Sequence, residues 1–233
     1  LERSFAQLEQ FSANAAHELR TPLTILRGEL QMALELDRGS TDYRLVLESN
    51  YEEVKRITRT VENLFMLSRI DNQRVSMEFE EVDLHTLLEE IARVGELLGA
   101  QRSIGITLSC AGTYHVRGDA VMLMQLFLNL VDNAIKYNRD GGHVHITMRD
   151  DERAVHVDIS DTGVGISAAD QARVFERFFR VDKPAARLRH GAGLGLSLAQ
   201  WIATMHGGEI RLRSTVGEGS VFTVILPTMQ PSN

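Results

Sequence analysis

The segment 119–137, DAVMLMQLFLNLVDNAIKY, decides the fold of the carboxy-terminal part of the chain. The Asp119 carboxylate is suited to capping a helix, so we expect a helix from there to about Tyr137. Nearly every side of this helix is apolar, which is typical of a helix packed inside a protein. Four of its polar residues recur at spacings of four, four and three, and so share one face: Gln125, Asn129, Asn133 and Lys136.

This polar stripe allows two interpretations. A stripe that faces solvent needs no ligand. Asparagines in a largely apolar helix are better explained by a ligand or an ion. An amide oxygen is a suitable hard ligand for Mg²⁺, which keeps several waters and also takes phosphate oxygens. Lys136 would offer a positive charge to the same phosphates.

The residues around this helix follow alternating strand and helix patterns. We expect strands at 77–82, 104–108, 114–116, 209–214 and 220–226, a hairpin from 143–148 and 154–160, and helices at 84–98 and 194–205. Helices on one face of a mostly antiparallel sheet make an α+β sandwich.

Two glycine-rich turns border these elements. Asp161 ends a strand and precedes Thr-Gly-Val-Gly-Ile, in which Gly163 and Gly165 would let the backbone approach a planar base. A carboxylate there is able to accept a hydrogen bond from the exocyclic amine of adenine. The second turn, 191–196, leads into the helix predicted from Leu194. The free amides at the start of that helix would suit phosphate oxygens. Either Gly-x-Gly alone is more often a plain turn, and neither fits a Walker loop or a Rossmann fingerprint.

The first 70 residues have the apolar spacing of two long helices. The heptad positions are Leu1, Phe5, Leu8, Ser12, Ala15, Leu19, Pro22 and Leu26 in the first helix, and Tyr43, Leu47, Asn50, Val54, Ile57, Val61 and Leu64 in the second. A turn at 37–41 joins the helices, and Ser40 or Thr41 would cap the second one. A hairpin that buries one stripe on each helix needs a partner, and a second copy would complete a four-helix bundle. A polar hinge follows at 71–74.

His17 lies two residues from seam positions on both sides, so it should point to solvent. A lone histidine there is usually a plain surface residue. Its neighbours favour chemistry, because Glu18 is able to take a proton from the ring and Thr21 lies one turn away on the same face. Pro22 removes an amide from the helix, which should bend there. A neutral imidazole beside a carboxylate is a competent nucleophile near pH 7.

The segment 11–23, FSANAAHELRTPL, resembles the phospho-acceptor motif of two-component sensor histidine kinases. Four later segments resemble that family's ATP-binding boxes in the family's order: the N box at 129–137, the first glycine box at 161–166, the F box at 175–180 and the second glycine box at 191–196. The resemblance covers nearly the whole chain. It implies a HisKA-type dimerisation and phosphotransfer hairpin at 1–73 and a Bergerat, or GHKL, ATP-binding domain at 76–230. The motif and long bundle also resemble the heavy-metal-sensor subgroup.

The resemblance implies a role for each matched residue. His17 would be phosphorylated from ATP, Glu18 would assist that step, and Thr21 would position water when the phosphorylated partner is dephosphorylated. Asn133 would hold Mg²⁺ and Asp161 would read adenine. The other nucleotide-site residues, of which Asn129 is also matched as catalytic, are Asn129, Lys136, Tyr137, Gly163, Gly165, Ile166, Arg180, Gly191, Gly193, Leu194, Gly195 and Leu196. Residues 181–190 would form a mobile lid.

The implied partners are a second copy of the chain and the receiver domain of a response regulator, which would dock near His17. A net charge of −7 argues against a nucleic-acid partner. Cys110 is the only cysteine, so no intrachain disulfide is possible. The chain has no apolar run of membrane-spanning length and no initiator methionine. We expect a piece of a longer protein, the cytoplasmic domain of an inner-membrane sensor, not itself inserted in the membrane.

Two other classes of protein compete with this interpretation. A chaperone-like or topoisomerase-like ATPase, or a protein serine kinase, would share the ATP fold, but the segment 17–22 on a heptad helix speaks against them. A docking module with an inactive nucleotide site is the other alternative. The intact residues Asn129, Asn133, Asp161 and Gly193 speak against it. His143, His145 and His156 on the predicted hairpin are better explained as the wet face of a sheet than as a metal site.

Overall fold

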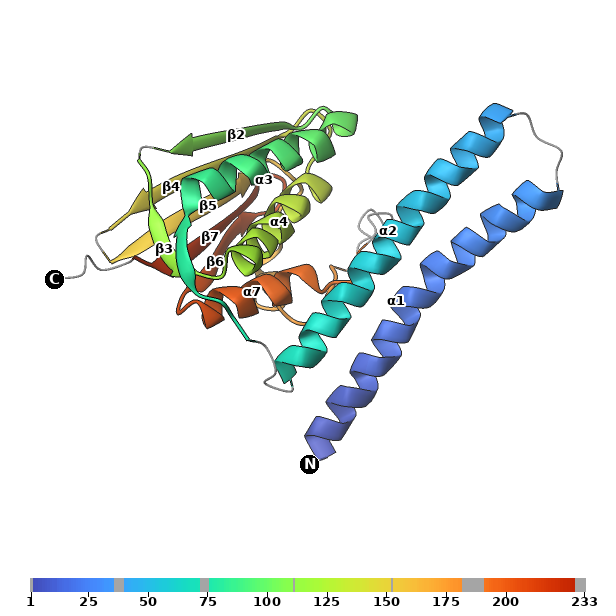
Figure 1. Ribbon diagram of the computed structural model, residues 1–233, viewed down its shortest axis with the longest axis horizontal. Helices are drawn as coiled ribbons and strands as arrows, with labels where there is room; N and C mark the ends of the chain where they lie inside the picture. Colours follow the sequence, from blue (N-terminus) through green and yellow to red (C-terminus); the bar gives the residue numbers. More distant parts are fainter. Residues whose placement is uncertain are drawn as a thin grey trace. The chain divides into compact units, whose positions relative to one another are not determined.

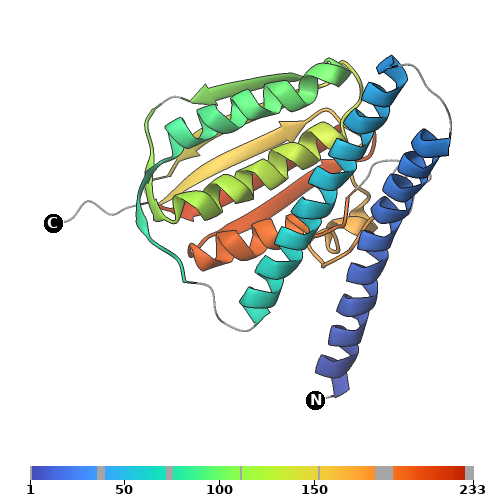
Figure 2. The ribbon, with the colours of Figure 1, turned by 45° about the vertical axis from the view of Figure 1, so that its right-hand side comes forward.

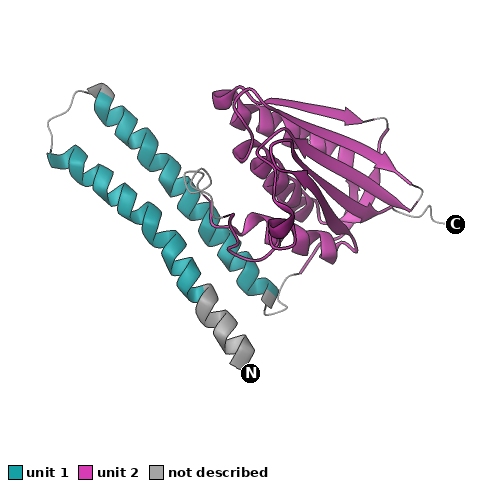
Figure 3. Ribbon diagram, turned by 180° about the vertical axis from the view of Figure 1, so that it is seen from behind, with its two compact units in different colours: residues 1–75 teal, residues 76–233 magenta. Residues whose placement is uncertain are grey.

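The computed structural model describes residues 2–35, 40–71, 76–110, 112–151, 153–181 and 191–228, with the side chains at 2–11, 40, 41 and 71 excepted. The chain divides into two compact units, unit 1 at residues 1–75 and unit 2 at residues 76–233 (Figure 3). No helix in the described part of the chain is both long and apolar enough to cross a membrane. Most of the predicted hinge at 71–74 and most of the predicted turn at 37–41 lie outside the described residues.

Unit 1 is a hairpin of two long helices, α1 (Glu2–Glu35) and α2 (Ser40–Asp71), which run side by side (Figure 1). Helix α1 continues without a break through Pro22. The two helices are joined by a polar contact, because the Asn50 side-chain amide donates to Glu29 Oε2 at 3.1 Å and the Ser49 hydroxyl donates to Glu29 Oε1 at 3.1 Å. The buried positions of the hairpin are Pro22, Ala33, Asn50, Thr60, Asn63 and Leu67.

A second stripe on α2 is apolar and exposed. It consists of Leu47, Tyr51, Val54, Val61 and Phe65, which are 63%, 64%, 47%, 45% and 69% exposed. Their spacings of four, three, seven and four follow one heptad row. Of the seam predicted for α2, Asn50 is buried within the single chain, while Leu47, Val54 and Val61 are exposed there, as expected for positions that a second copy would cover.

Unit 2 is built on a five-stranded sheet with the order β2-β4-β5-β7-β6. The strands are β2 (Gly105–Cys110), β4 (His143–Asp150), β5 (Ala154–Asp161), β6 (Glu209–Thr215) and β7 (Gly219–Pro227). Strands β2 and β4 are parallel and all other neighbours are antiparallel. A separate pair joins β1 (Glu80–Asp83) to β3 (His115–Gly118).

Three helices lie on one face of this sheet: α3 (Leu84–Gly99), α4 (Ala120–Lys136) and α7 (Gly195–Met205) (Figures 1 and 2). The α+β sandwich predicted from the sequence is therefore confirmed. The predicted cap of α4 is confirmed as well, since Asp119 accepts a hydrogen bond from the Met122 amide at 3.1 Å. Alternation along β5 buries Val155, Val157 and Ile159 under the helices.

The core of unit 2 consists of large side chains that water does not reach. The fully buried ones include Leu84, Leu88, Ile91, Leu123, Leu126, Phe127, Leu130, Ile146, Ile159, Leu194 and Leu198. Each such side chain contributes about 1.5–3 kcal/mol by leaving water. Most of α4 is therefore fixed by apolar burial on several sides, which leaves its polar stripe to be explained by another cause.

Two local predictions differ from the structure. The strand predicted at 77–82 begins only at Glu80, because the Glu78 amide donates to Asp119 Oδ2 at 3.1 Å instead of pairing with a strand. A short helix, α5 (Ala168–Gln171), was not predicted. Its first turn is capped by Ser167, whose side chain accepts from the Asp170 amide.

Candidate functional site

The polar stripe of α4 is partly exposed to solvent on unit 2. Asn129, Asn133 and Lys136 are all half-buried. Asn129 Nδ2 is inaccessible to water and has no hydrogen-bond partner among the described residues. A buried amide nitrogen without an acceptor costs about 1–3 kcal/mol, so an acceptor on a bound group would stabilise this atom.

The second glycine turn lies against this stripe. A Cβ atom on Gly191 would stand 2.1 Å from Lys136 Nζ, and one on Gly195 would stand 3.4 Å from Asn129 Oδ1. The absence of side chains at these two glycines therefore keeps space open beside both polar groups. Helix α7 begins at Gly195, and no side chain caps it. Leu194, buried in the core, anchors the turn immediately before these uncapped amides, and half-buried Leu196 follows in the first turn.

The F box is tied directly to the second glycine turn. The Phe178 amide donates to the Gly193 carbonyl at 2.9 Å, and Phe178 has φ of +63°. A positive φ is uncommon for a bulky residue and is held here by that hydrogen bond. Gly193 has φ of +69°, and a Cβ atom there would stand 2.8 Å from the Phe178 carbonyl carbon. Arg180 follows at the edge of the described residues, and the rest of the predicted lid, 182–190, lies outside them.

Asp161 ends β5 as a buried carboxylate, 8% exposed. The Gly163 amide donates to its Oδ1 at 2.8 Å, and Ser220 on β7 also donates to it. Burial raises the pKa of Asp161, while these hydrogen bonds act in the opposite direction. A carboxylate has about four lone-pair sites, so one that accepts these hydrogen bonds is still able to accept from an amine donor.

The first glycine turn is packed tightly against the end of α4. A Cβ atom on Gly163 would stand 2.4 Å from the Tyr137 carbonyl oxygen, which also accepts a hydrogen bond from the Val164 amide at 3.1 Å. Gly165 has φ of +65°, and a Cβ atom there would stand 2.0 Å from the Thr215 carbonyl oxygen. The two glycines therefore allow the turn to lie between α4 and the β6–β7 connection.

Sequence reasoning missed the polar residues that brace this turn from β6 and β7. The Ser214 hydroxyl accepts from the Ile166 amide at 2.8 Å and lies 3.0 Å from the Ser220 hydroxyl. Gln171 Nε2 donates to the carbonyl oxygens of Ile166 and Ser214 at 3.0 and 2.9 Å. Only the register of β6 against β7, which pairs Ser214 with Ser220, would have indicated this network.

His17, Glu18 and Thr21 belong to unit 1. His17 is exposed on α1, as predicted, and Glu18 is half-buried. The Thr21 hydroxyl donates to the His17 carbonyl oxygen at 3.3 Å, a common way for threonine to satisfy itself within a helix. Pro22 is buried. The imidazole is thus accessible from solvent, and the helix behind it is fixed by packing.

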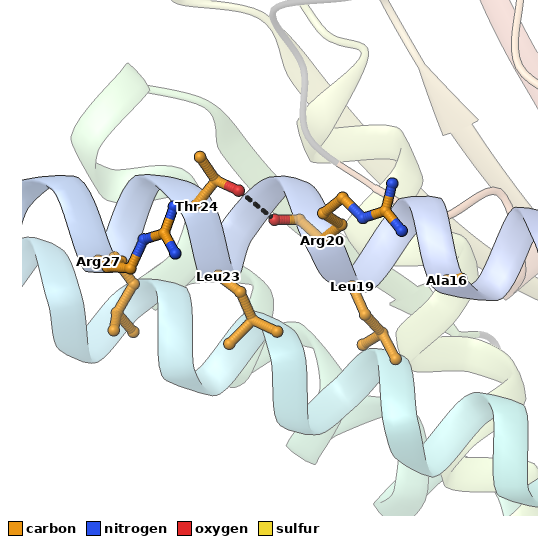
Figure 4. A pocket seen from close by; sticks show the side chains of 7 residues that line it. Ala16, Leu19, Arg20, Leu23, Thr24 and Arg27 are labelled. Atoms are coloured by element: carbon orange, nitrogen blue, oxygen red, sulfur yellow. Dashed lines mark hydrogen bonds between the residues drawn. The ribbon is translucent and has the colours of Figure 1, made fainter.

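A groove runs along α1 from beside His17 through the next three turns. Its lining residues are Ala16, Leu19, Arg20, Leu23, Thr24, Leu26 and Arg27. Figure 4 shows Leu19 and Leu23 extending from one side of α1, while Arg20 and Thr24 lie on the other and are joined by a hydrogen bond from the Thr24 hydroxyl to the Arg20 carbonyl. The surface next to His17 therefore combines leucine side chains with two guanidinium groups.

The structure brings together residues that the sequence placed far apart. The two glycine turns, the F box and the end of α4 meet within unit 2, and the contacts of Asn129, Lys136, Tyr137, Asp161 and Phe178 join them. The phospho-acceptor segment is part of the other unit.

Two family models match the chain. The one described as the His Kinase A (phospho-acceptor) domain matches residues 7–73. The one described as the histidine kinase-, DNA gyrase B-, and HSP90-like ATPase matches residues 118–230. The matches confirm the fold class and the ATP-binding type that the motifs predicted for the carboxy-terminal domain.

Curated relatives match over almost the whole chain. Sensor histidine kinase RppB of a Synechocystis strain is 34% identical over 229 residues, which are 97% of this chain and 50% of RppB. Sensor protein IrlS of Burkholderia pseudomallei is 36% identical over 227 residues, which are 97% of this chain and 48% of IrlS. The chain spans about half the length of the curated relatives it matches.

Solved structures match as well. The Acinetobacter baumannii histidine kinase AdeS matches with a TM-score of 0.72 at 26% identity, covering 92% of this chain and 98% of that one. Histidine kinase ThkA, in a complex with response regulator protein TrrA, matches with a TM-score of 0.75 at 26% identity, covering 98% of this chain and 64% of that one.

Proposed function

Because the chain belongs to the sensor histidine kinase family, we propose that it transfers the γ-phosphoryl group of ATP to His17 and then to an aspartate of a response regulator. The observation that carries the proposal is the assembled nucleotide site of unit 2, in which two glycine turns meet the polar stripe of α4. An exposed imidazole on α1 supplies the acceptor.

Mg²⁺ fits the residues of this site. The orphaned Nδ2 of Asn129 calls for an acceptor such as a phosphate oxygen, and the space kept open by Gly195 lies beside Oδ1 of the same side chain. We assign the Asn133 side-chain oxygen as the metal ligand, since Mg²⁺ favours oxygen donors and shares them with phosphates. Bound Mg²⁺ would neutralise part of the charge that develops on the transferred group.

The chain's own residues bind and orient the nucleotide. Asp161 accepts from the adenine amine, and the backbone of Gly163, Gly165 and Ile166 lies along the base. Lys136, with its ammonium 5.1 Å from the centre of the Tyr137 ring, faces the phosphates. The uncapped amides at the start of α7, from Gly195 and Leu196, suit phosphate oxygens, and Arg180 approaches from the F box.

Phosphoryl transfer to His17 requires a ring nitrogen that holds a free electron pair. That nitrogen attacks the γ-phosphorus, a nitrogen–phosphorus bond forms, and the bond to the bridging oxygen of the departing ADP breaks. Glu18 accepts the proton from the ring's other nitrogen. Positioning and charge neutralisation supply most of the rate increase in phosphoryl transfer, so no further covalent chemistry is needed from the protein.

The groove on α1 is the proposed docking surface for the regulator. It lies next to His17, and its leucines and arginines suit a partner with an apolar face and acidic residues. ThkA, a structural relative, is seen in complex with a response regulator protein. Thr21, one turn from His17, would orient water when the phosphorylated regulator is dephosphorylated.

The exposed heptad row of α2 supports a homodimer. Leu47, Tyr51 and Phe65 each expose more than 60% of their surface, which a monomer would have to leave in water. Two hairpins packed through these rows would form a four-helix bundle. We propose that the bundle belongs to the cytoplasmic domain of an inner-membrane sensor. Membership of the heavy-metal-sensor subgroup stays a prediction.

The test is incubation of the chain with γ-labelled ATP and Mg²⁺, followed by acid treatment. The wild type should acquire label that acid removes, as expected for phosphohistidine. His17→Ala should bind ATP normally and acquire no label, whereas Asn133→Ala should lose labelling through weaker Mg²⁺–ATP binding. Label on the His17→Ala chain, or acid-stable label on the wild type, would contradict the assignment of the acceptor.

A further inference from the structure

We propose that Arg102 is a positioning residue of the nucleotide site, which acts by holding the carboxyl end of α4. The inference rests on the ATP binding proposed above and adds a residue that lies in none of the motifs. Arg102 ends the short 3₁₀ helix Ala100–Arg102 after α3 and is 34 residues away from Lys136 along the chain.

The guanidinium of Arg102 spans the last turn of α4 and the residues after it. Nη1 donates to the carbonyl oxygens of Ile135 at 2.8 Å and Lys136 at 3.3 Å, and Nη2 donates to that of Asn138 at 2.7 Å. Nε donates to Asp140 Oδ1 at 2.8 Å. All three nitrogens of the planar group are therefore used, in a geometry that a lysine ammonium cannot reproduce.

This contact brings a charged donor to the carbonyl groups at the end of the helix. The last four carbonyls of a helix have no amide partner within it, and they carry the negative end of the helix dipole, about half an elementary charge. Arg102 donates to the carbonyl of Lys136 and to that of Ile135, which also accepts from the Asn138 amide at 3.2 Å. Its positive charge, paired with Asp140 on one side, lies beside that end of the helix. Its own carbonyl oxygen accepts from the Gly141 amide at 3.0 Å, which fixes Arg102 from the other side.

The segment that Arg102 holds leads to both halves of the site. Lys136 faces the glycine turn at Gly191, and the Tyr137 carbonyl receives the Val164 amide of the other glycine turn. Asn138 is fully buried, and its Oδ1 accepts from the hydroxyl of Thr162, the residue that follows Asp161. A shift of the α4 end would therefore displace the phosphate side and the adenine side together.

The charge of Arg102 predicts that its loss lowers the affinity for ATP. ATP is a polyanion, and the negative end of the α4 dipole lies next to Lys136, which faces the phosphates. Arg102 offsets that negative end, so its loss should weaken nucleotide binding more than it slows transfer from bound nucleotide. A residue that only stabilised the fold would lower the melting temperature without this selective effect on affinity.

The experiment compares Arg102→Met and Arg102→Lys with wild type, in the full chain. Arg149→Met is the matched control, since Arg149 makes one 3.6 Å ion pair with Asp158 on the sheet. ATP affinity is measured by calorimetry, and KM and kcat by labelling of His17, with thermal unfolding recorded for each variant.

Arg102→Met should raise Kd and KM for ATP about tenfold and lower kcat less than about threefold, because several charge-assisted hydrogen bonds are lost. Arg102→Lys, which keeps the charge and loses the fork, should fall between Arg102→Met and wild type. Arg149→Met should stay within about twofold of wild type, since an exposed ion pair contributes little.

A folded Arg102→Met chain with Kd and KM within about twofold of wild type would overturn the inference. If Arg102→Met fails to fold, Arg102→Lys decides: unchanged affinity overturns the proposal and weakened affinity supports it. Failure of the wild type to bind ATP would instead overturn the proposed function, and this inference with it.

Discussion

Helix α4 in unit 2 and helix α2 in unit 1 are both long and carry apolar rows, but the apolar row of α4 is buried within the chain and that of α2 is exposed. In α4, seven apolar residues from Leu123 to Ile135 are buried within the chain. In α2, Leu47, Tyr51 and Phe65 remain mostly exposed, while the buried positions include Asn50, Thr60 and Asn63.

The difference shows which part of the molecule is complete alone. Unit 2 closes its own core, so the residues of the nucleotide site are held by packing and need no other chain. In unit 1, the buried positions of α2 are mostly polar, with Leu67 as the apolar exception, whereas its exposed row is apolar, which leaves that hydrophobic surface for an interface. We therefore expect substitutions in the two units to separate association from nucleotide binding.

The largest effect is expected for the association of two copies when the exposed row of α2 is changed. The double variant Leu47→Glu, Val54→Glu would place unpaired carboxylates inside the proposed bundle, at a cost of several kcal/mol. Association should weaken about a thousandfold by light scattering or sedimentation, with ATP affinity unchanged. Leu45→Glu is the control, because Leu45 is also exposed but lies on the opposite side of α2 from Leu47. A double variant that stays dimeric would contradict the proposal that the exposed row of α2 forms the interface.

In unit 2, Asp161→Asn should remove most ATP affinity. If the introduced side-chain amide keeps its oxygen toward the Gly163 amide, its NH₂ group faces the adenine amine, donor against donor. An unmatched polar pair of this kind costs about 1–3 kcal/mol, or a loss of roughly 10- to 100-fold in affinity. Titration with ATP measures this, and the dimer should persist. Affinity equal to wild type would mean that Asp161 does not read the base.

The same variant has a stability effect with a defined sign. Burial raises the pKa of Asp161, so the folded chain holds this proton at pH values where the unfolded chain, with a pKa near 3.8, has lost it. The wild type therefore loses stability as the pH rises from about 3.8 through the folded pKa. Relative to wild type, Asp161→Asn should be more stable at about pH 7 than at about pH 4 in denaturant unfolding. The opposite trend would contradict the burial argument.

A matched pair of glycines tests how tightly the site is packed. Gly165 and Gly141 have φ of +65° and +69°, but a Cβ atom at Gly165 would meet the Thr215 carbonyl at 2.0 Å, while Gly141 has nothing within 4 Å. Gly141→Ala should cost about 1 kcal/mol through backbone strain alone. Gly165→Ala should cost about 2–3 kcal/mol and also weaken ATP binding. If Gly165→Ala and Gly141→Ala lose the same stability in denaturant unfolding, the turn at Gly165 moves away from Thr215 at little energetic cost.

The smallest effect concerns His206, a buried histidine at the end of α7. Its Nε2 accepts from the Asp119 amide at 3.0 Å, and burial lowers its pKa below the usual 6.5. The unfolded chain takes up a proton near pH 6.5 and the folded chain does not, so stability falls as the pH drops below that value. Between about pH 7.5 and 5.5 the loss should be about 1 kcal/mol. His206→Asn should lack this component, and a variant with the wild-type pH profile would disprove it.

The phospho-acceptor motif, both glycine turns and the N box could be identified from the sequence, because each is a short run whose residue types and order carry the signal. The brace of Ser214 and Gln171 around Ile166 could not, since it depends on the register of β6 against β7 and on a short helix that periodicity does not reveal. The start of β1 was misplaced for a similar reason, as the Glu78 amide bonds to Asp119, 41 residues away.

The sequence by itself determined most of the helices and strands of this protein, the cap of α4, and the types of residue at its reactive positions. Hydrogen bonds within a helix and the alternation of a strand act over a few residues, and so they can be read locally. Only the tertiary structure decided which row of α2 turns inward, how Gly193 holds Phe178 at positive φ, and that Arg102 ends α4. Burial and capping by distant groups depend on neighbours that the chain meets only after it has folded.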